Sequence, residues 1–382
     1  MNLLIITPWY PNPVHLQDGN FVRAQAELLA RQHRVEVVCV YEGRNSGARP
    51  QVLRTVESGV RVLRCSYPGD GPRPLRLLHR RQAWRAALLA RELRPDLIHA
   101  HVLIDGGIVA SRLAERLGVP FVVTGHSHRW LEPWPWLRLP ELWLARRAAR
   151  SAAAVIAVSP ALARGMRHHG IKAKVRVISN VIATELFYPE ERTIGQPFTF
   201  LHVSDFTPNK NIPALLTAFA EVARLHPDTR LHLAGNGDHD LLRSLVRTSH
   251  PFGKLRDHPR SRPVEISGPH EPPSVARLMR AADAFVLTSM LETQSLVTVE
   301  ALLSGLPVIS TRSGGPDGIV TTPQRGELVA VDDQKQLQDA MVRRVKAGPD
   351  DLTTRLSRHR NARAEFGDVA EKLNQLYTQL LS

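Results

Sequence analysis

The sequence predicts an α/β protein with two doubly wound parallel-sheet domains, and three observations support this fold class. Short runs rich in Val, Ile and Leu alternate with amphipathic stretches of helix length from end to end, as in parallel sheets covered on both faces. The chain has 382 residues, which is too long for one ordinary core and suits two domains. A polar, aperiodic segment with two prolines and a glycine, residues 187–197, separates the halves.

Each expected element follows from its apolar period. Strands are expected in the first half at 3–7, 35–40, 60–64, 97–100, 121–124, 155–158 and 175–178, with helices near 21–31, 75–93, 107–117, 142–150 and 160–168. The second half predicts strands at 198–203, 231–234, 264–266, 284–287 and 308–310, with helices near 213–226, 241–248, 273–282, 295–304 and 336–345. A last helix is expected within 369–382.

The net charge of +14 favours an anionic partner: nucleic acid, an anionic membrane surface or a phosphorylated substrate. No nucleic acid is expected, because zinc-ligand spacing, an RNA-binding aromatic signature and a basic low-complexity arm are missing from the sequence. The arginine-rich stretches 73–95 and 144–154 are interleaved with apolar residues, as in helices that rest on acidic lipid headgroups. Solvated arginine faces explain the same pattern equally well.

The remaining composition favours a cytoplasmic location, either free or peripheral on the inner face of the plasma membrane. No apolar run approaches the roughly 18 residues of a membrane helix, and the opening MNLLIITPWYP is expected to be a strand and not a signal peptide. Cys39 and Cys65 show neither disulfide nor metal spacing, which is typical of the reducing cytosol.

The most informative stretch is SMLETQSLVTVEALLSGLPVIST, residues 289–311. It follows the strand 284–287 and starts a helix near Ser295, whose first backbone N–H groups would be free to bind phosphate. Glu292 and Glu300 are eight residues apart, which on a helix is ~80° around the axis, so Glu292 is expected in the loop and Glu300 on the helix. Each carboxylate can accept hydrogen bonds from sugar or ribose hydroxyls. The plainer alternative is an acidic loop before a buried α/β unit.

This stretch resembles the E-x7-E signature of retaining glycosyltransferases of the GT4 type, the group 1 glycosyl transferases. Gln294 stands where that family usually has Phe, and Ser295 where it usually has Gly. The resemblance implies the GT-B fold: two facing Rossmann-like domains with a cleft between them and a C-terminal helix that crosses back to the first domain. The domains implied are an acceptor-side domain over 1–186, a nucleotide-sugar-binding domain over 197–361, and the returning helix over 362–382.

The resemblance also implies site residues. Lys210 matches the phosphate-binding lysine, Glu292 the residue that holds sugar hydroxyls, and His126 a histidine that contacts the donor sugar; these three are the expected catalytic residues. The expected donor-binding positions are Gly19, Ser204, Asp205, Gly268, His270, Thr293, Gln294, Ser295, Leu296 and Glu300. His99 and His101 are expected to support or pack beneath them.

Two segments bear on charge at this site. Asp205 stands where the family has an arginine, and at low effective dielectric it would repel a diphosphate by about 1 kcal/mol or more. We therefore expect Asp205 to point away, or Arg312, Lys172 or Lys174 to compensate. The sequence GNGDHD, 235–240, lacks the third glycine of a dinucleotide fingerprint, and its acidic pair, Asp238 and Asp240, follows a strand where the resembled family has a plain turn and not a metal site. Because members of that family do not need a metal for the reaction, the resemblance implies no metal and no cofactor.

Four of the six tryptophans fall in RWLEPWPWLRLPELWL, residues 129–144. Indole rings favour a membrane interface and arginine can meet lipid phosphate. We expect Trp130, Trp134, Trp136 and Arg138 to face an acceptor or a membrane; the alternative is that the rings pack onto the sheet.

The resemblance thus implies a retaining, metal-independent hexosyltransferase. It would move a hexose-type sugar from a nucleoside-diphosphate sugar to a glycan or lipid-linked acceptor in bacterial polysaccharide or glycoconjugate synthesis. Two alternatives share the architecture: a sugar-nucleotide 2-epimerase, and a non-catalytic basic binding protein.

Overall fold

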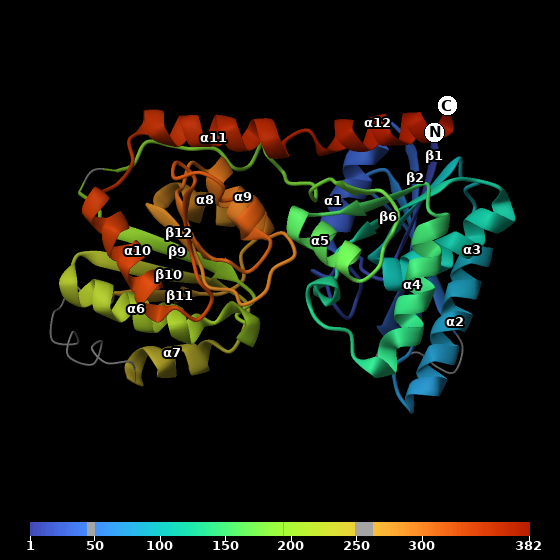
Figure 1. Ribbon diagram of the computed structural model, residues 1–382, viewed down its shortest axis with the longest axis horizontal. Coiled ribbons are helices and arrows are strands. Elements are labelled where there is room, and N and C mark those ends of the chain that lie inside the picture. Colours follow the sequence, from blue (N-terminus) through green and yellow to red (C-terminus); the bar gives the residue numbers. More distant parts are fainter. Residues whose placement is uncertain (44–49, 194, 249–262) are drawn as a thin grey trace. The chain divides into compact units, whose positions relative to one another are not determined.

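The computed structural model describes residues 1–43, 50–193, 195–248 and 263–382, and the chain divides into two compact units (Figure 1). The first unit comprises Met1–Val181 together with Asp368–Ser382, and the second comprises Ile182–Gly367. The sequence places the corresponding borders near residues 187–197 and 361. Each unit is a sheet with helices on both faces, as the fold class predicts.

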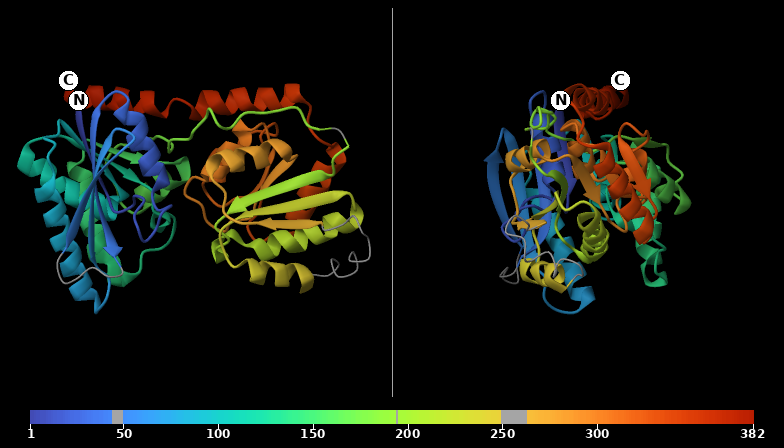
Figure 2. Two further views of the ribbon diagram at one scale, coloured as in Figure 1. Left: turned by 180° about the vertical axis from the view of Figure 1, so that it is seen from behind. Right: turned by 90° about the vertical axis from the view of Figure 1, so that its left-hand side faces the viewer.

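The sheet of the first unit has eight strands in the order β3-β4-β2-β1-β5-β6-β7-β8. Figure 2 shows this sheet, coloured blue to green, from two further sides. The strands are β1 (Asn2–Thr7), β2 (Arg34–Gly43), β3 (Gln51–Glu57), β4 (Val60–Pro68), β5 (Leu97–His101), β6 (Phe121–Gly125), β7 (Ala154–Ala157) and β8 (Val175–Val177). All pair in parallel except β3, which is antiparallel to β4 at the sheet edge. β3 was not predicted, because its residues are exposed or half-buried and its apolar run is short.

Alternate residues of the first sheet point to opposite faces. Leu4 and Ile6 of β1 pack with α2 (Arg73–Ala90), α3 (Ile108–Leu117), α4 (Leu139–Ser151) and α5 (Pro160–His168). Leu3 and Ile5 pack with α1 (Asn20–Ala30) and with the last helix, α12 (Val369–Leu381), which contributes the fully buried Tyr377. The carboxyl-terminal helix is thus part of the core of the first unit.

The sheet of the second unit is parallel throughout, in the order β11-β10-β9-β12-β13-β14. The strands are β9 (Phe198–Ser204), β10 (Thr229–Gly235), β11 (Val264–Ser267), β12 (Ala284–Leu287), β13 (Val308–Thr311) and β14 (Gly326–Val329). One face is covered by α6 (Ile212–Leu225), α7 (His239–Thr248) and α10 (Gln334–Ala347), and the other by α8 (Pro272–Ala281), α9 (Leu296–Leu303) and α11 (Leu352–Phe366) (Figure 1). Because β9 lies beside β12 and β12 beside β13, the loops that follow these strands meet at one edge of the sheet.

Two features of the second unit differ from the simple apolar pattern. Helix α11 was not predicted, because it packs partly through the buried guanidinium groups of Arg355 and Arg358 instead of an apolar stripe. Arg358 donates to Asp350 at 2.8 Å and Arg355 to the carbonyl of Arg280 at 3.0 Å. The segment 187–193 packs onto the second unit, since Phe187 is buried in its core.

In the described residues, we find no helix with both the length and the apolar character needed to cross a membrane.

Candidate functional site

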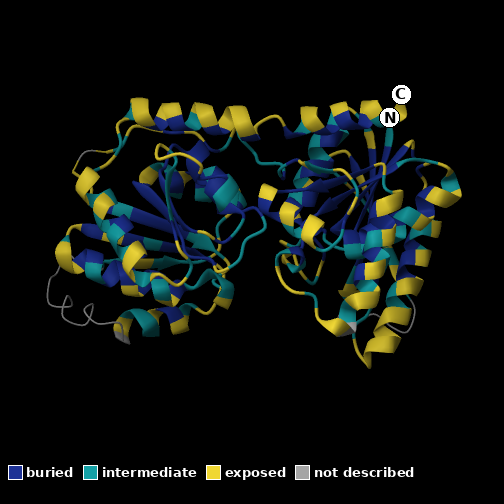
Figure 3. Cartoon of the chain, viewed as in Figure 1, coloured by how far each residue is buried: buried dark blue, intermediate teal, exposed yellow. Residues whose placement is uncertain are grey.

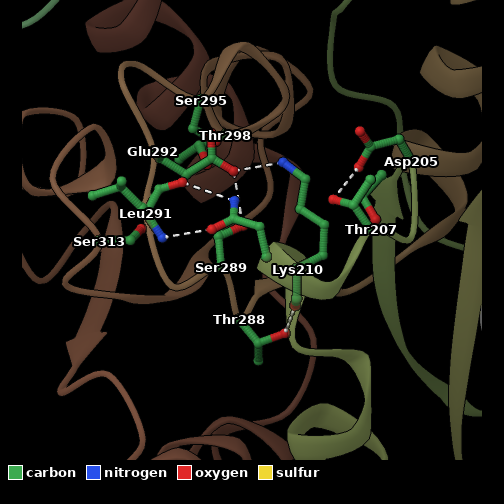
Figure 4. Close-up of polar contacts among 12 residues, drawn as sticks. Asp205, Thr207, Lys210, Thr288, Ser289, Leu291, Glu292, Ser295, Thr298 and Ser313 are labelled. Atoms are coloured by element: carbon green, nitrogen blue, oxygen red, sulfur yellow. Dashed lines mark hydrogen bonds and ion pairs between the residues drawn. The ribbon is translucent and has the colours of Figure 1, made fainter. Parts of the chain in front are cut away.

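The loops after β9 and β12 are joined through a short 3₁₀ turn, Pro208–Lys210 (Figure 4). The Asn209 side chain donates to the carbonyl of Leu291 at 2.9 Å and accepts from the Leu291 N–H at 3.1 Å. The hydroxyl of Thr288 donates to the carbonyl of Lys210 at 2.7 Å. These contacts fix Lys210 against the loop that carries Glu292. Asn209 was not among the site residues predicted from the sequence. An amide side chain can donate a hydrogen bond to a backbone carbonyl and accept one from the N–H of the same residue.

Lys210 and Glu292 form an ion pair within this junction (Figure 4). The Lys210 Nζ lies 2.6 Å from Oε1 of Glu292, and the same oxygen accepts from the Ser289 hydroxyl at 2.8 Å. The two charged side chains are only 18% and 14% exposed. Both are therefore oriented by their partners and partly shielded from water, where such a charge-assisted bond is stronger.

The Glu292 loop is supported from behind by the loop after β13. The Glu292 N–H donates to the carbonyl of Ser313 and the Gly315 N–H to the carbonyl of Glu292, both at 2.8 Å. The Asp317 carboxylate in turn accepts from the Gly314 N–H at 2.8 Å. Asp317 thereby stabilises this turn.

Ser295 begins helix α9 in the left-handed conformation, with φ of 70° and ψ of 77°. Glycine adopts this conformation readily, and serine adopts it at a cost of about 1 kcal/mol. Its hydroxyl is bonded to that of Thr298 at 2.7 Å and does not cap the helix. Within the described part of the chain, the backbone N–H groups of Leu296 and Val297 have no hydrogen-bond partner, as the helix start requires.

A cavity of about 300 Å³ opens beside this helix start, wholly within the second unit. Its lining residues are Phe187, Val203, Ser204, Asp205, Lys210, His270, Pro272, Val275, Leu296, Val297 and Glu300. Six of the predicted site residues thus come together here: Ser204, Asp205, Lys210, His270, Leu296 and Glu300. Glu292 reaches the same place through its ion pair with Lys210.

Glu300 is the acidic residue of the helix face in this cavity. Protein atoms crowd around its carboxyl group, and the loss of water raises its pKa to about 7. No residue in the described ranges makes a hydrogen bond to the carboxylate of Glu300. An acceptor without a protein partner in a half-closed, largely apolar hollow is suited to bind hydroxyl groups of a ligand.

Asp205 turns its carboxylate to the hydroxyl of Thr207, which lies 3.2 Å away, while Lys210 extends toward Glu292 (Figure 4). Asp205 is exposed to solvent, which weakens its repulsion of an anion in the cavity. Of the cations considered as compensation, Arg312, Lys172 and Lys174, none lines the cavity.

Ser204 is held by a buried histidine. His202 Nδ1 lies 2.8 Å from the carbonyl of Val286, so it must carry the proton, and Nε2 accepts from the Ser204 hydroxyl at 2.8 Å. Burial lowers the pKa of His202 to about 4, which keeps the ring neutral.

The other predicted donor-binding positions of the second unit lie around the cavity, outside its lining. Gly268 follows β11, where His270 Nε2 is 2.8 Å from the Ser267 hydroxyl. Thr293 and the buried Gln294 lie between Glu292 and the helix start. A Cβ at Gly315 would approach the Gln294 backbone to 2.6 Å, so the loop after β13 is closely packed against them.

In the first unit, Gly19 and His126 lie at the ends of α1 and β6. Gly19 has φ of 65°, and an added Cβ would meet the Trp9 carbonyl oxygen at 2.2 Å, so only glycine fits. His126 is 6% exposed, its Nε2 lies 2.8 Å from Nδ1 of His101, and its ring packs on Phe21. Burial lowers the pKa of His126 to about 3, so its imidazole is neutral.

His126 is one end of a stack of three imidazole rings, with His101 and His99 beneath it. His99 stacks on His101 and His101 on His126, with ring centroids 4.5 and 5.1 Å apart. His99 also bonds the hydroxyl of Thr124 at 2.7 Å and that of Tyr377 on α12 at 2.6 Å. One of the two facing nitrogens of His101 and His126 carries a proton and the other accepts it, so the tautomers of these two rings are linked.

The acidic pair in 235–240 has structural partners. Asp238 accepts from the Leu241 N–H at 2.9 Å at the start of α7, and Asp240 pairs with Arg243 at 2.9 Å.

The tryptophan segment differs in part from its prediction. Trp130 is 1% exposed and packs in the core, and Trp134 is half-buried against it, so Trp130 cannot face a membrane or an acceptor. Trp136 is 75% exposed, and Arg138 pairs with Glu141 at 3.5 Å. The aromatic pattern alone does not distinguish rings that fill the space beside α5 from rings left on the surface.

Fold and site together define a two-domain α/β glycosyltransferase of GT-B type. Residues 19–186 match the model of Glycosyltransferase Family 4, and residues 197–346 match the model of Glycosyl transferases group 1. The chain belongs to this glycosyltransferase family, as its E-x7-E stretch indicates.

Three curated relatives are similar to this chain at 26–28% identity. A sulfoquinovosyl transferase from Arabidopsis thaliana is 26% identical over 61% of this chain and 46% of its own length. Mannosylfructose-phosphate synthase from Agrobacterium fabrum is 28% identical over 68% of this chain and 64% of its own length. The chain thus spans about half to two thirds of these two relatives. Glycogen synthase from Mycobacterium tuberculosis is 27% identical over 89% of this chain and 85% of its own length.

Two solved structures are similar in fold over the whole chain. Sucrose-phosphate synthase from Thermosynechococcus elongatus has a TM-score of 0.76 at 22% identity, covering 100% of this chain and 99% of that one. HepE from Anabaena in complex with UDP has a TM-score of 0.73 at 20% identity, covering 100% of both chains.

Proposed function

We propose that the chain is a retaining, metal-independent glycosyltransferase that uses a nucleoside-diphosphate sugar. One observation carries the proposal: a single cavity combines the Lys210 ammonium, the free N–H groups at the start of α9 and the unpartnered carboxylate of Glu300. A cation and a helix start suit phosphate, and an acceptor without a partner suits a diol.

The diphosphate is assigned to Lys210 and to the N–H groups of Leu296 and Val297. Negative charge grows on the leaving diphosphate as the bond to the sugar breaks. Positive groups already in place stabilise that charge, and such preorganised electrostatic stabilisation usually accelerates a reaction of this kind more than any other effect. In this proposal they supply the role that a divalent cation has in other transferases.

The nucleoside is assigned to the rest of the cavity. Glu300 would accept hydrogen bonds from the ribose hydroxyls, while Val203, Val275 and Phe187 form an apolar wall. The loop that holds Gly268 and His270 is assigned to the base. A volume of about 300 Å³ is at the lower end of ligand pockets, which suits a nucleoside.

Glu292 is assigned to the hydroxyls of the transferred sugar. Its Oε1 already accepts from Lys210 and Ser289, so it is poorly suited to act as a nucleophile. We therefore assign retention to reaction on one face of the sugar, where the leaving phosphate takes the proton of the acceptor hydroxyl.

The donor class is supported by similar folds that hold UDP and UDP-glucose. We propose a hexose as the sugar and a glycan or a lipid-linked molecule as the acceptor, in bacterial polysaccharide or glycoconjugate synthesis at the cytoplasmic face of the membrane. Two relatives are named for products of these two kinds, glycogen synthase for a glycan and alpha-monoglucosyldiacylglycerol synthase for a lipid.

The test is a panel of UDP-, GDP- and ADP-sugars incubated with oligosaccharide and lipid acceptors, with products followed by NMR. We expect one donor to be consumed with the anomeric configuration of its sugar kept, and EDTA to leave the rate unchanged. Inversion would contradict the retaining mechanism, and loss of the rate in EDTA would contradict metal independence. An epimer of the donor formed without acceptor would identify a 2-epimerase instead, and binding without turnover of any donor would indicate a binding protein.

A further inference from the structure

The amino-terminal ends of α2 and α4 carry a cluster of exposed apolar side chains in the first unit. Every residue from 71 to 78 is exposed, so the first turns of α2 project from the body of the unit (Figure 3). The apolar members, which we call the leucine–tryptophan patch, are Leu75, Leu77, Leu78, Trp136, Leu139 and Trp143. Their exposed fractions run from 40% for Leu75 to 75% for Trp136.

The two helix ends are held beside each other by an ion pair. Arg73 on α2 lies 2.8 Å from Glu141 on α4, and Arg138 approaches the other oxygen of Glu141 at 3.5 Å. The patch is therefore one surface built from two segments that lie more than fifty residues apart in the sequence.

The charge around the patch is positive. Arg76 and Arg147 are exposed and have no acidic partner among the residues that the structure describes, and Arg147 lies over the Trp143 ring at 6.0 Å. Of the acids on the two segments, Glu141 is already paired with two arginines. Arginines outnumber acids in 69–85 and in 129–150, so the surface would repel a basic partner and attract an anionic one.

We propose that the leucine–tryptophan patch is a docking surface for an anionic lipid bilayer. Burial of the projecting leucines is favourable only where water is excluded. The acyl region of a bilayer excludes water, and a phosphate backbone does not. Indole rings with wet N–H groups occupy the headgroup level, and unpaired guanidinium groups meet lipid phosphates there. This surface replaces the membrane face expected from the sequence, since Trp130 is buried while α2 contributes three leucines that the aromatic pattern did not include.

The docking does not depend on the proposed sugar transfer, and it is tested with the full chain and lipid vesicles. Vesicles of phosphatidylcholine alone and of phosphatidylcholine with an equal part of phosphatidylglycerol are sedimented with the protein. We expect binding only to the anionic vesicles, and a decrease of binding as salt is raised. The variant Leu77→Ser/Trp136→Ser/Trp143→Ser should bind to the anionic vesicles at least about tenfold more weakly than wild type. Leu225→Ser/Leu241→Ser, at exposed apolar positions of the second unit, should bind like wild type.

A second pair of variants tests whether binding depends on the charge at the patch or on the net charge of the chain. Arg76→Glu/Arg147→Glu should lose binding, whereas Arg112→Glu/Arg360→Glu, which changes the net charge equally at exposed sites elsewhere, should keep most of it. Circular dichroism and thermal unfolding establish that each variant is folded. Equal sedimentation with both vesicle types, or equal loss in patch and control variants, would overturn the proposal. So would concentration-dependent self-association that the patch variant abolishes without any vesicle binding, because the patch would then be a protein interface.

Discussion

The Nζ atom of Lys210 lies 2.6 Å from Oε1 of Glu292, which links the loops after two adjacent strands, β9 and β12, by opposite charges. Both side chains are more than four-fifths buried, so neither charge is fully solvated and each depends on the other. The pair places a cation at the cavity beside α9 and leaves Oε2 of Glu292 to meet a ligand. Stability and the proposed chemistry therefore share these two residues.

Removing both members of the pair should cost less free energy of unfolding than the two single removals added together. In Lys210→Met the Glu292 carboxylate loses its counter-charge, and we expect the free energy of unfolding to fall by about 1–2 kcal/mol. Lys210→Met/Glu292→Gln should be more stable than the sum of the single changes predicts. Urea unfolding of the four proteins measures this coupling. Strict additivity would show that the ion pair contributes nothing, and sugar transfer by either single variant would contradict its catalytic role.

Donor affinity should depend on the ionisation of Glu300. The pKa of Glu300 is raised to about 7 by burial, and the ionised form is the better acceptor for a diol. Affinity for a nucleotide sugar should therefore rise as pH increases through 7 and should be nearly independent of pH in Glu300→Gln. Calorimetric titration between about pH 6 and 8 tests this, because the diphosphate diester of the donor does not titrate there. A flat wild-type profile would remove Glu300 from the ribose site.

The Asn209 amide should be needed as donor and acceptor together. Asn209→Asp places a carboxylate 2.9 Å from the Leu291 carbonyl oxygen, where the two would repel. We expect turnover to fall at least tenfold and stability by about 1–2 kcal/mol, because a backbone group loses its partner. The matched control is Thr207→Ala, which removes an exposed hydroxyl on the same loop. Wild-type turnover in Asn209→Asp would show that Lys210 is positioned by other contacts.

Acid should destabilise the fold through its buried histidines. Burial lowers the pKa of His99 and His126 to about 3 and of His202 to about 4, below the unfolded value near 6.5. A depressed histidine pKa stabilises the folded state above pH 6.5, and this stability is lost as pH falls toward the folded pKa. Each ring contributes a slope of about 1.4 kcal/mol per pH unit. The raised pKa of Glu300 has the opposite effect, because it increases the free energy of unfolding as pH falls from 7 toward the unfolded pKa of the carboxyl group. This single group is outweighed by the three histidines.

The measurement is the free energy of unfolding at several pH values between about 4 and 7, for wild type and His126→Phe. The variant should show a shallower acid slope. An identical slope in both proteins would mean that His126 takes up a proton in the folded state, contrary to its burial.

The fold class follows from the sequence because buried parallel strands are nearly continuous apolar runs, as in β1 and β12. The elements that were not predicted lack this signal. β3 and β14 are edge strands whose residues are mostly exposed or half-buried, and α11 buries arginines. Each is specified by its neighbours instead of by its own period.

The grouping of Lys210, Glu300 and Ser204 at one cavity could be expected, since Ser204 ends β9, Lys210 lies just before α6 and Glu300 lies in the first turns of α9, all at the same sheet edge. The structural role of Asn209 could not be predicted from the sequence, because its hydrogen-bond partner is a backbone unit eighty-two residues away. The burial of Trp130 was likewise hidden, since an aromatic segment looks the same whether its rings fill a core or face outward.

The most direct measurement of the central claim is the change in melting temperature of the full chain with each donor of the UDP-, GDP- and ADP-sugar panel, compared among wild type, Lys210→Met and Glu300→Ala. We predict that at least one nucleotide sugar raises the melting temperature of the wild type and that both substitutions abolish the increase. If no nucleotide sugar stabilises the wild type, or if it stabilises both variants equally, the cavity between Lys210 and Glu300 is not a donor site.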